Sequence, residues 1–127
     1  MKRILVIDDD AMARSIFRSL LEEEGYGVSE AADGATGLRM FREGGWDLVV
    51  LDIFMPGLSG LDALQDMDPE RSGVPVVVIS GAGSATGADP LHLAMTLGAS
   101  RSFSKDFEHG DFLAAVRELT AKAGVPA

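Results

Sequence analysis

The sequence has no cysteine, no long apolar run and no excess of basic residues, and each absence excludes a class of protein. Without cysteine there is neither a disulfide framework nor a thiolate metal site. Met1–Arg3 leads directly into an apolar run too short for a secretory signal or a membrane span, which predicts a cytoplasmic protein without membrane contact. The formal charge of −9 disfavours direct nucleic-acid binding and favours cations or basic protein surfaces as partners.

What remains is an ordinary globular composition. The chain has 127 residues, of which 46% are hydrophobic and 24% charged, enough for one domain with a real core. Apolar runs predict strands at 4–7, 47–52 and 75–80, with weaker ones at 27–31 and 101–104. Apolar residues at helical spacing predict helices at 11–24, 35–43, 59 or 60 to 67, 90–97 and 110–122. This five-fold alternation predicts an α/β fold with a parallel sheet and helices on both faces.

Carboxylates, a hydroxyl and an amine stand at the carboxyl ends of four predicted strands: Asp8 and Asp9, Asp52, Ser80, and Lys105. Ligand sites of open parallel sheets lie beyond these ends, so we expect the five side chains at one rim. Three carboxylates need a cation, and Mg²⁺ fits because it binds one or two carboxylates plus a phosphate oxygen. Lys105 and Ser80 suit phosphoryl oxygens, and Asp52, central in the sheet, is the predicted nucleophile that forms an acyl phosphate.

Four stretches in order resemble the receiver domain of two-component response regulators: VIDDD (6–10), DLVVLDIFMPGLSG (47–60), VVVIS (76–80) and GASRSFSKDF (98–107). The resemblance implies a flavodoxin-like, doubly wound, five-stranded parallel sheet of order 2-1-3-4-5. It implies a receiver domain at 1–123 and a short C-terminal tail at 124–127. It further implies a phosphoacceptor, not an enzyme, which receives its phosphoryl group from a sensor histidine kinase or histidine phosphotransfer protein and signals through an unknown downstream protein.

The same resemblance assigns a role to each acidic residue. Asp52 is the residue phosphorylated from a phosphohistidine. Asp9 and Asp52 are implied to be direct Mg²⁺ ligands, and Asp8 assists directly or through water. The backbone carbonyl of Phe54 completes the protein ligands.

Ser80 is implied to be the switch hydroxyl that meets the phosphoryl group, and Lys105 to contact that group. Near these two residues the sequence departs from the family pattern. Asp106 stands where proline is usual, so a trans Lys105–Asp106 bond is expected. Ser102 stands where an aromatic is common, and Phe103 is predicted to face the other side of the strand. Activation is therefore expected to work mainly through the loop after Ser80.

Three other interpretations stay open. An aspartyl-phosphate phosphatase of the haloacid-dehalogenase type usually has a second aspartate two residues after its nucleophile, where this chain has Phe54. A flavodoxin needs a phosphate loop after the first strand, where Asp8, Asp9 and Asp10 would repel phosphate. A receiver-like module that works without phosphorylation is compatible with the replacements at 102 and 106.

The first predicted helix carries two further features. Asp10 immediately precedes it and is expected to cap it. Met12 and Ile16 lie four residues apart beside its core face. They are either partly buried in the core or form a docking edge for the helices of a partner.

Overall fold

The computed structural model describes residues 1–54, 60–80, 94–104 and 106–123, and within them five parallel strands form one sheet. The strands are β1 (Arg3–Ile7), β2 (Gly27–Ala31), β3 (Leu48–Asp52), β4 (Val76–Ser80) and β5 (Arg101–Ser104). Their order in the sheet is β2-β1-β3-β4-β5, and every neighbouring pair is parallel. The predicted doubly wound, flavodoxin-like class and its strand order are confirmed.

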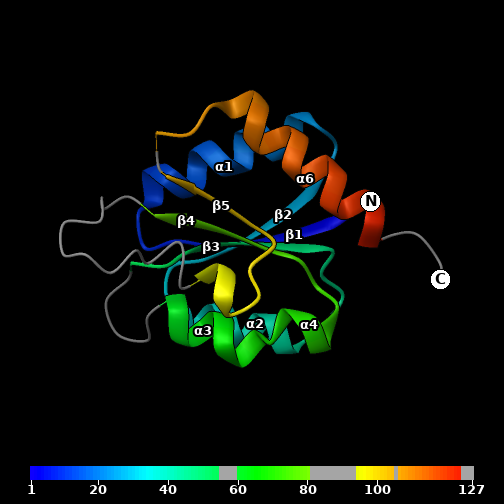
Figure 1. Cartoon of the computed structure of the whole chain (residues 1–127). Coiled ribbons are helices and arrows are strands. Elements are labelled where there is room, and N and C mark those ends of the chain that lie inside the picture. The colour runs from blue at the N-terminus through cyan, green and yellow to red at the C-terminus, as the bar shows by residue number, and fades with distance from the viewer. Residues whose placement is uncertain (55–59, 81–93, 105, 124–127) are drawn as a thin grey trace.

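Helices cover both faces of this sheet, as Figure 1 shows. One face carries α1 (Ala11–Glu23) and α6 (His109–Ala123), and the other carries α2 (Gly34–Arg42), α3 (Gly60–Met67) and α4 (Pro69–Ser72). Residues 94–96 are also helical, whereas the first part of the helix predicted at 90–97 lies outside the described residues. Among the helices of the described ranges, none has the length and apolar character to cross a membrane.

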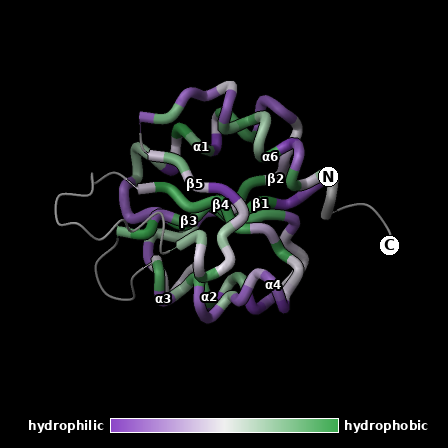
Figure 2. The backbone as a smooth tube through the Cα atoms, viewed as in Figure 1, coloured by the Kyte–Doolittle hydropathy of each residue, from purple (hydrophilic) through white to green (hydrophobic). Residues whose placement is uncertain are grey.

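Alternation along the central strands builds a hydrophobic core on each side of the sheet. Ile4 and Val6 of β1 pack with α1 and α6, whereas Leu5 and Ile7 pack with α2 and α3. All four are fully buried, and each such side chain contributes about 1.5–3 kcal/mol relative to an exposed one. Figure 2 shows the hydrophobic colour concentrated along these strands. Two-sided burial explains why the strands read as continuous apolar runs.

Capping residues fix where the first two helices begin after their strands. The Asp10 carboxylate accepts a hydrogen bond from the Met12 amide (3.0 Å), which confirms Asp10 as the N-cap of α1. The Asp33 carboxylate accepts from the Thr36 amide (2.7 Å) at the start of α2. This backbone hydrogen bond from Thr36 is the main reason that the pKa of Asp33 lies below its ordinary value. Both helices therefore begin close to the carboxyl edge of the sheet.

One described helix has no counterpart among the predicted elements. The four-residue α4 follows α3, with Pro69 at its first position and Gly73 at its C-cap in the left-handed region (φ 76°). Four residues are too few for apolar periodicity to show, and this is why the pattern indicates no helix there.

Candidate functional site

Three aspartates from two neighbouring strands meet at the carboxyl edge of the sheet. Asp8 and Asp9 directly follow β1, and Asp52 is the last residue of the adjacent β3. One carboxylate oxygen from each lies within 4.8 Å of those from the other two. Asp8 and Asp52 are buried, with 1% and 3% of their surface exposed, whereas Asp9 is exposed. The predicted convergence of the three carboxylates is thus found.

The same local device orients the two buried carboxylates. The Asp10 amide donates to Oδ1 of Asp8 (2.9 Å), and the Phe54 amide donates to Oδ1 of Asp52 (3.0 Å). In both cases the donor is the backbone two residues further along, the pattern of an Asx turn. Each strand end therefore carries its own means of holding the carboxylate in one orientation.

The backbone of Asp8 is braced from β2 and α1. Its amide donates to the Ala31 carbonyl (3.1 Å), and its carbonyl accepts from Nη1 of Arg14 (2.7 Å). Arg14 also pairs with Glu30 (3.1 Å), which in turn pairs with Arg18 (2.5 Å). The hydrogen bond from Arg18, together with the charges of both arginines, lowers the pKa of Glu30. The sequence pattern does not indicate that Arg14 contacts this site, because its contacts depend on where β2 places Glu30.

Gly60 allows α3 to begin directly against the end of β3. A Cβ atom at position 60 would lie 2.3 Å from the Asp52 carbonyl oxygen and 2.3 Å from the Cα of Ile53. No real side chain fits at these separations, so the close approach requires glycine. Glycine at this position could be read in the sequence as a helix start, but not as a packing requirement at the site.

The remaining predicted site residues are placed only in part. Ser80 is buried and is the last residue of β4, the strand next to the one that ends in Asp52. Phe54 follows Asp52 by two residues and has an exposed side chain. Lys105 lies outside the described residues, so its contact with a phosphoryl group stays a prediction. The trans geometry expected for the Lys105–Asp106 bond stays a prediction for the same reason.

Phe103 of β5 faces the side of the sheet covered by α1 and α6. It packs against the ring of Phe112 in α6, with the ring centroids 5.9 Å apart. Ser102, its neighbour along the strand, faces the opposite side. The predicted orientation of Phe103 is confirmed, whereas the loop after Ser80 expected to carry activation lies outside the described residues.

An apolar groove of about 190 Å³ lies beside α1. Its lining includes Met12, Ile16 and Phe17 of α1 together with Phe107 and His109. Among these lining residues, the rings of Phe17 and Phe107 stack with their centroids 5.5 Å apart. Met12 is 73% exposed and is not buried in the core, whereas Ile16 is 44% exposed and remains partly covered.

The three carboxylates fit a Mg²⁺ ion. Mg²⁺ takes oxygen ligands at about 2.1 Å in an octahedron, so neighbouring ligands lie about 3.0 Å apart and opposite ones about 4.2 Å apart. The three oxygens already lie within 4.8 Å of one another and would draw closer together around such an ion. The donor set is purely oxygen and negatively charged, as a hard dication requires. Asp8, Asp9 and Asp52 could therefore hold Mg²⁺.

The chain matches a known protein family over most of its length. The family model of the response regulator receiver domain matches residues 4–117. The chain belongs to the response regulator receiver family. The resemblance proposed from the four sequence stretches is thereby confirmed.

This receiver domain has relatives over nearly its whole length. It is 34% identical over 125 residues to YkoG of Bacillus subtilis, named as an uncharacterized transcriptional regulatory protein, a match that covers 95% of this chain and 52% of YkoG. The chain thus spans about half the length of the curated relatives it matches. A receiver domain from Clostridium thermocellum is 31% identical with a TM-score of 0.86, and 96% of each chain is covered. TrrA of Thermotoga maritima, solved in complex with Mg²⁺-BeF, is 31% identical with a TM-score of 0.81, covering 94% of this chain and 99% of TrrA.

Proposed function

We propose that this receiver domain accepts a phosphoryl group on Asp52, with Mg²⁺ as cofactor, from a phosphohistidine of a sensor histidine kinase or histidine phosphotransfer protein. The observation that carries the proposal is the convergence of Asp8, Asp9 and Asp52 at the carboxyl edge of the sheet. The Mg²⁺-BeF complex of the similar TrrA supports the choice of metal. A receiver-like module without phosphorylation would have no use for three carboxylates that repel one another.

Mg²⁺ would be held by the carboxylates of Asp8, Asp9 and Asp52 and by the backbone carbonyl of Phe54, with Asp8 binding directly or through water. When bound, the ion offsets negative charge on the oxygens of the transferred group. The amides of residues 10 and 54 keep two of the carboxylates oriented before any ion arrives. Such preorganisation reduces the cost of assembling the ligand set.

The proposed chemical step is a nucleophilic displacement at phosphorus. A carboxylate oxygen of Asp52 forms a bond to phosphorus while the bond from phosphorus to the donor imidazole nitrogen breaks, and the electron pair leaves with that nitrogen. The product on Asp52 is an acyl phosphate. The hydroxyl of Ser80, at the end of the adjacent strand, and the ammonium of Lys105 would contact the oxygens of the transferred group.

The groove beside α1 supports a helical partner. Its rim presents Met12 and Ile16, and its lining includes Asp10, which directly follows Asp8 and Asp9 in the chain. A partner helix with an apolar stripe and basic flanks fits this surface, because apolar anchors at helical spacing bind such grooves and acids attract bases. Docking there would bring a phosphohistidine on the partner close to the acidic site.

The output of this receiver domain is proposed to be a protein–protein contact in the cytoplasm. Its role is to carry a phosphoryl group rather than to turn over a separate substrate, and its charge of −9 argues against direct contact with nucleic acid or a membrane. The match to YkoG covers 52% of that protein, which is named an uncharacterized transcriptional regulatory protein. We place the receiver domain at residues 1–123 and its short tail at 124–127.

Intact mass spectrometry after incubation with Mg²⁺ and acetyl phosphate tests the proposal. The wild-type protein should gain the mass of one phosphoryl group, whereas Asp52→Asn and a wild-type sample with EDTA should gain none. Asp10→Asn is the matched control, because asparagine caps a helix as well as aspartate does and position 10 is outside the proposed ligand set. Equal labelling of Asp52→Asn, or no labelling of the wild type, would refute the assignment. Steady turnover of a small phosphoester would favour the phosphatase interpretation instead.

A further inference from the structure

Arg14 joins the end of β1 to a carboxylate on β2. Its Nη1 donates to the backbone carbonyl of Asp8 (2.7 Å), and its Nε donates to Oε1 of Glu30 (3.1 Å). Only 17% of the Arg14 side chain is exposed. The guanidinium is a rigid planar fork, so its two hydrogen bonds fix the positions of both acceptors relative to each other.

This contact is one of at least three hydrogen bonds that hold Asp8 in place. The Asp8 amide donates to the Ala31 carbonyl of β2, and Oδ1 of its carboxylate accepts from the Asp10 amide. Both of these partners are backbone groups of neighbouring segments. The Arg14 side chain donates to the Asp8 carbonyl, at the residue where β1 has ended and α1 has not yet begun.

We infer that Arg14 is a positioning residue for the metal site, acting through the backbone of Asp8, an inference that rests on the proposed Mg²⁺ ligand set. Mg²⁺ demands near-ideal octahedral geometry at about 2.0–2.1 Å, so a displaced ligand weakens binding. Groups that orient a metal ligand without touching the metal commonly change affinity by about 10- to 100-fold when removed.

Glu30 supports the proposed role of Arg14 by binding its guanidinium. It accepts from Arg14 through one oxygen and from Arg18 through the other, so it holds the Arg14 guanidinium in place. Its negative charge also offsets the positive charge of Arg14, which would otherwise oppose a dication nearby. The hydrogen bond from Arg18 is also the main cause of the lowered pKa of Glu30, which is consistent with a carboxylate held between two arginines.

Arg18 offers a matched control on the same helix. It pairs with the same Glu30 and, through Nη1, with Glu22 one turn further along α1. Its hydrogen bonds thus belong to the same network, but they lead away from the strand end. Replacing Arg18 removes a cation and an ion pair with Glu30 while leaving the hydrogen bond on the Asp8 carbonyl in place.

Calorimetric titration with Mg²⁺, without a phosphodonor, tests the inference on the full chain. Arg14→Gln should raise the Kd for Mg²⁺ by about tenfold, and Arg14→Lys should raise it as well, because an ammonium on a flexible stem lacks the planar fork that fixes both acceptors relative to each other. Arg18→Gln should bind Mg²⁺ within about twofold of the wild type. In acetyl phosphate reactions, Arg14→Gln should need more Mg²⁺ for its half-maximal rate yet reach the wild-type rate at saturation, a split that a loss of folding would not produce.

A wild-type Mg²⁺ affinity in Arg14→Gln would overturn the inference while leaving the proposed function intact. Tighter binding in Arg14→Gln with unchanged binding in Arg14→Lys would also overturn it, because only the charge of residue 14 would then matter. Should Arg14→Gln fail to fold, the Kd of Arg14→Lys decides the question: a raised value supports the inference and a wild-type value overturns it. A wild-type protein that binds no Mg²⁺ would overturn both this inference and the proposed function.

Discussion

Asp9 brings a third negative charge to a site where two buried carboxylates already lie within 4.8 Å of its own. Because Asp9 itself is exposed, water screens this repulsion, which at such separations amounts to about 1 kcal/mol per pair. Without a metal ion the charge serves no stabilising purpose among the three carboxylates. Residue 9 is therefore a position where the proposed metal site costs stability in the metal-free protein.

Asp9→Asn should consequently stabilise the metal-free protein. We expect the free energy of unfolding in urea with EDTA to rise by about 1–2 kcal/mol, because asparagine keeps the shape of aspartate and removes its repulsion with two carboxylates. Asp10→Asn, the same change one residue later, should leave stability within about 0.5 kcal/mol, since it preserves the N-cap of α1. A loss of stability in Asp9→Asn would contradict the account of mutual repulsion.

At the scale of single residues, the sequence indicates which side chains carry the proposed chemistry better than it indicates which residues hold them in position. The roles proposed for Asp8, Asp9 and Asp52 follow from acidic residues at the ends of apolar runs, since parallel strands bring those ends to one edge. Arg14 and Gly60 could not be found in this way. Arg14 acts through a contact between segments, and the closeness of Gly60 to the β3 backbone appears only when α3 is in place.

Among whole elements, the strands were predicted most closely, and the weaker patterns at 27–31 and 101–104 match the bounds of β2 and β5. Strands covered on both faces need uninterrupted apolar residues, so β1, β3 and β4 match their predicted positions to within a residue. Helices were also located, because one apolar stripe per helix faces the sheet. The exception is α4, whose four residues are set by Pro69 and by the left-handed backbone at Gly73 rather than by any periodic pattern.

The junction between β3 and α3 gives a prediction about these elements. Gly60→Ala would place a Cβ atom 2.3 Å from the Asp52 carbonyl oxygen, so either α3 or the end of β3 must shift. We expect a loss of about 1–3 kcal/mol in the free energy of unfolding. We also expect weaker Mg²⁺ binding by calorimetry, because the shift moves a proposed ligand.

Gly110→Ala is the control for Gly60→Ala. At position 110, in the first turn of α6, the nearest atom to a new Cβ is a flexible carboxylate oxygen of Glu108 at 3.1 Å. This change should leave Mg²⁺ binding unaltered and stability equal or slightly higher, since alanine favours a helix. If Gly60→Ala behaved in the same way, the close packing of α3 on β3 would not be needed for the site.

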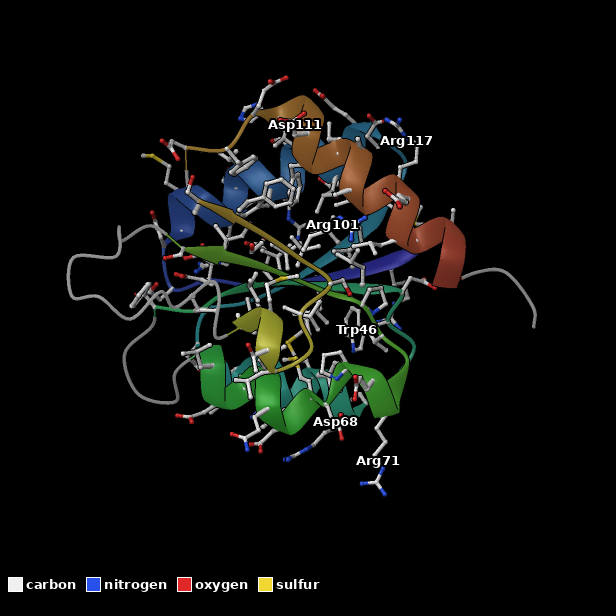
Figure 3. The ribbon with its side chains drawn as sticks, in the orientation of Figure 1. Trp46, Asp68, Arg71, Arg101, Asp111 and Arg117 are labelled. Atoms are coloured by element: carbon white, nitrogen blue, oxygen red, sulfur yellow. The ribbon has the colours of Figure 1, made fainter. Side chains whose placement is uncertain are left out.

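The molecule as a whole separates its proposed metal site from its one tryptophan. Trp46 lies just before β3, on the side of the molecule where the N-terminus lies, as Figures 1 and 3 show. It is buried, donates from its indole nitrogen to the Met40 carbonyl (2.9 Å) and lies under the guanidinium of Arg3 (4.3 Å). The six residue-to-residue steps from Trp46 to Asp52, which is the last residue of β3, span about 20 Å when extended.

This separation makes Trp46 a reporter of unfolding that does not sense the metal directly. Adding Mg²⁺ to the folded protein should leave its emission unchanged, whereas its urea transition should move to higher denaturant. At free Mg²⁺ of about 100 times Kd, an ion that binds only the folded state adds about 2.7 kcal/mol to the free energy of unfolding. The gain should disappear in Asp52→Asn, and sodium at equal ionic strength should not reproduce it. An equal shift in wild type and Asp52→Asn would show that Mg²⁺ acts elsewhere on this acidic chain.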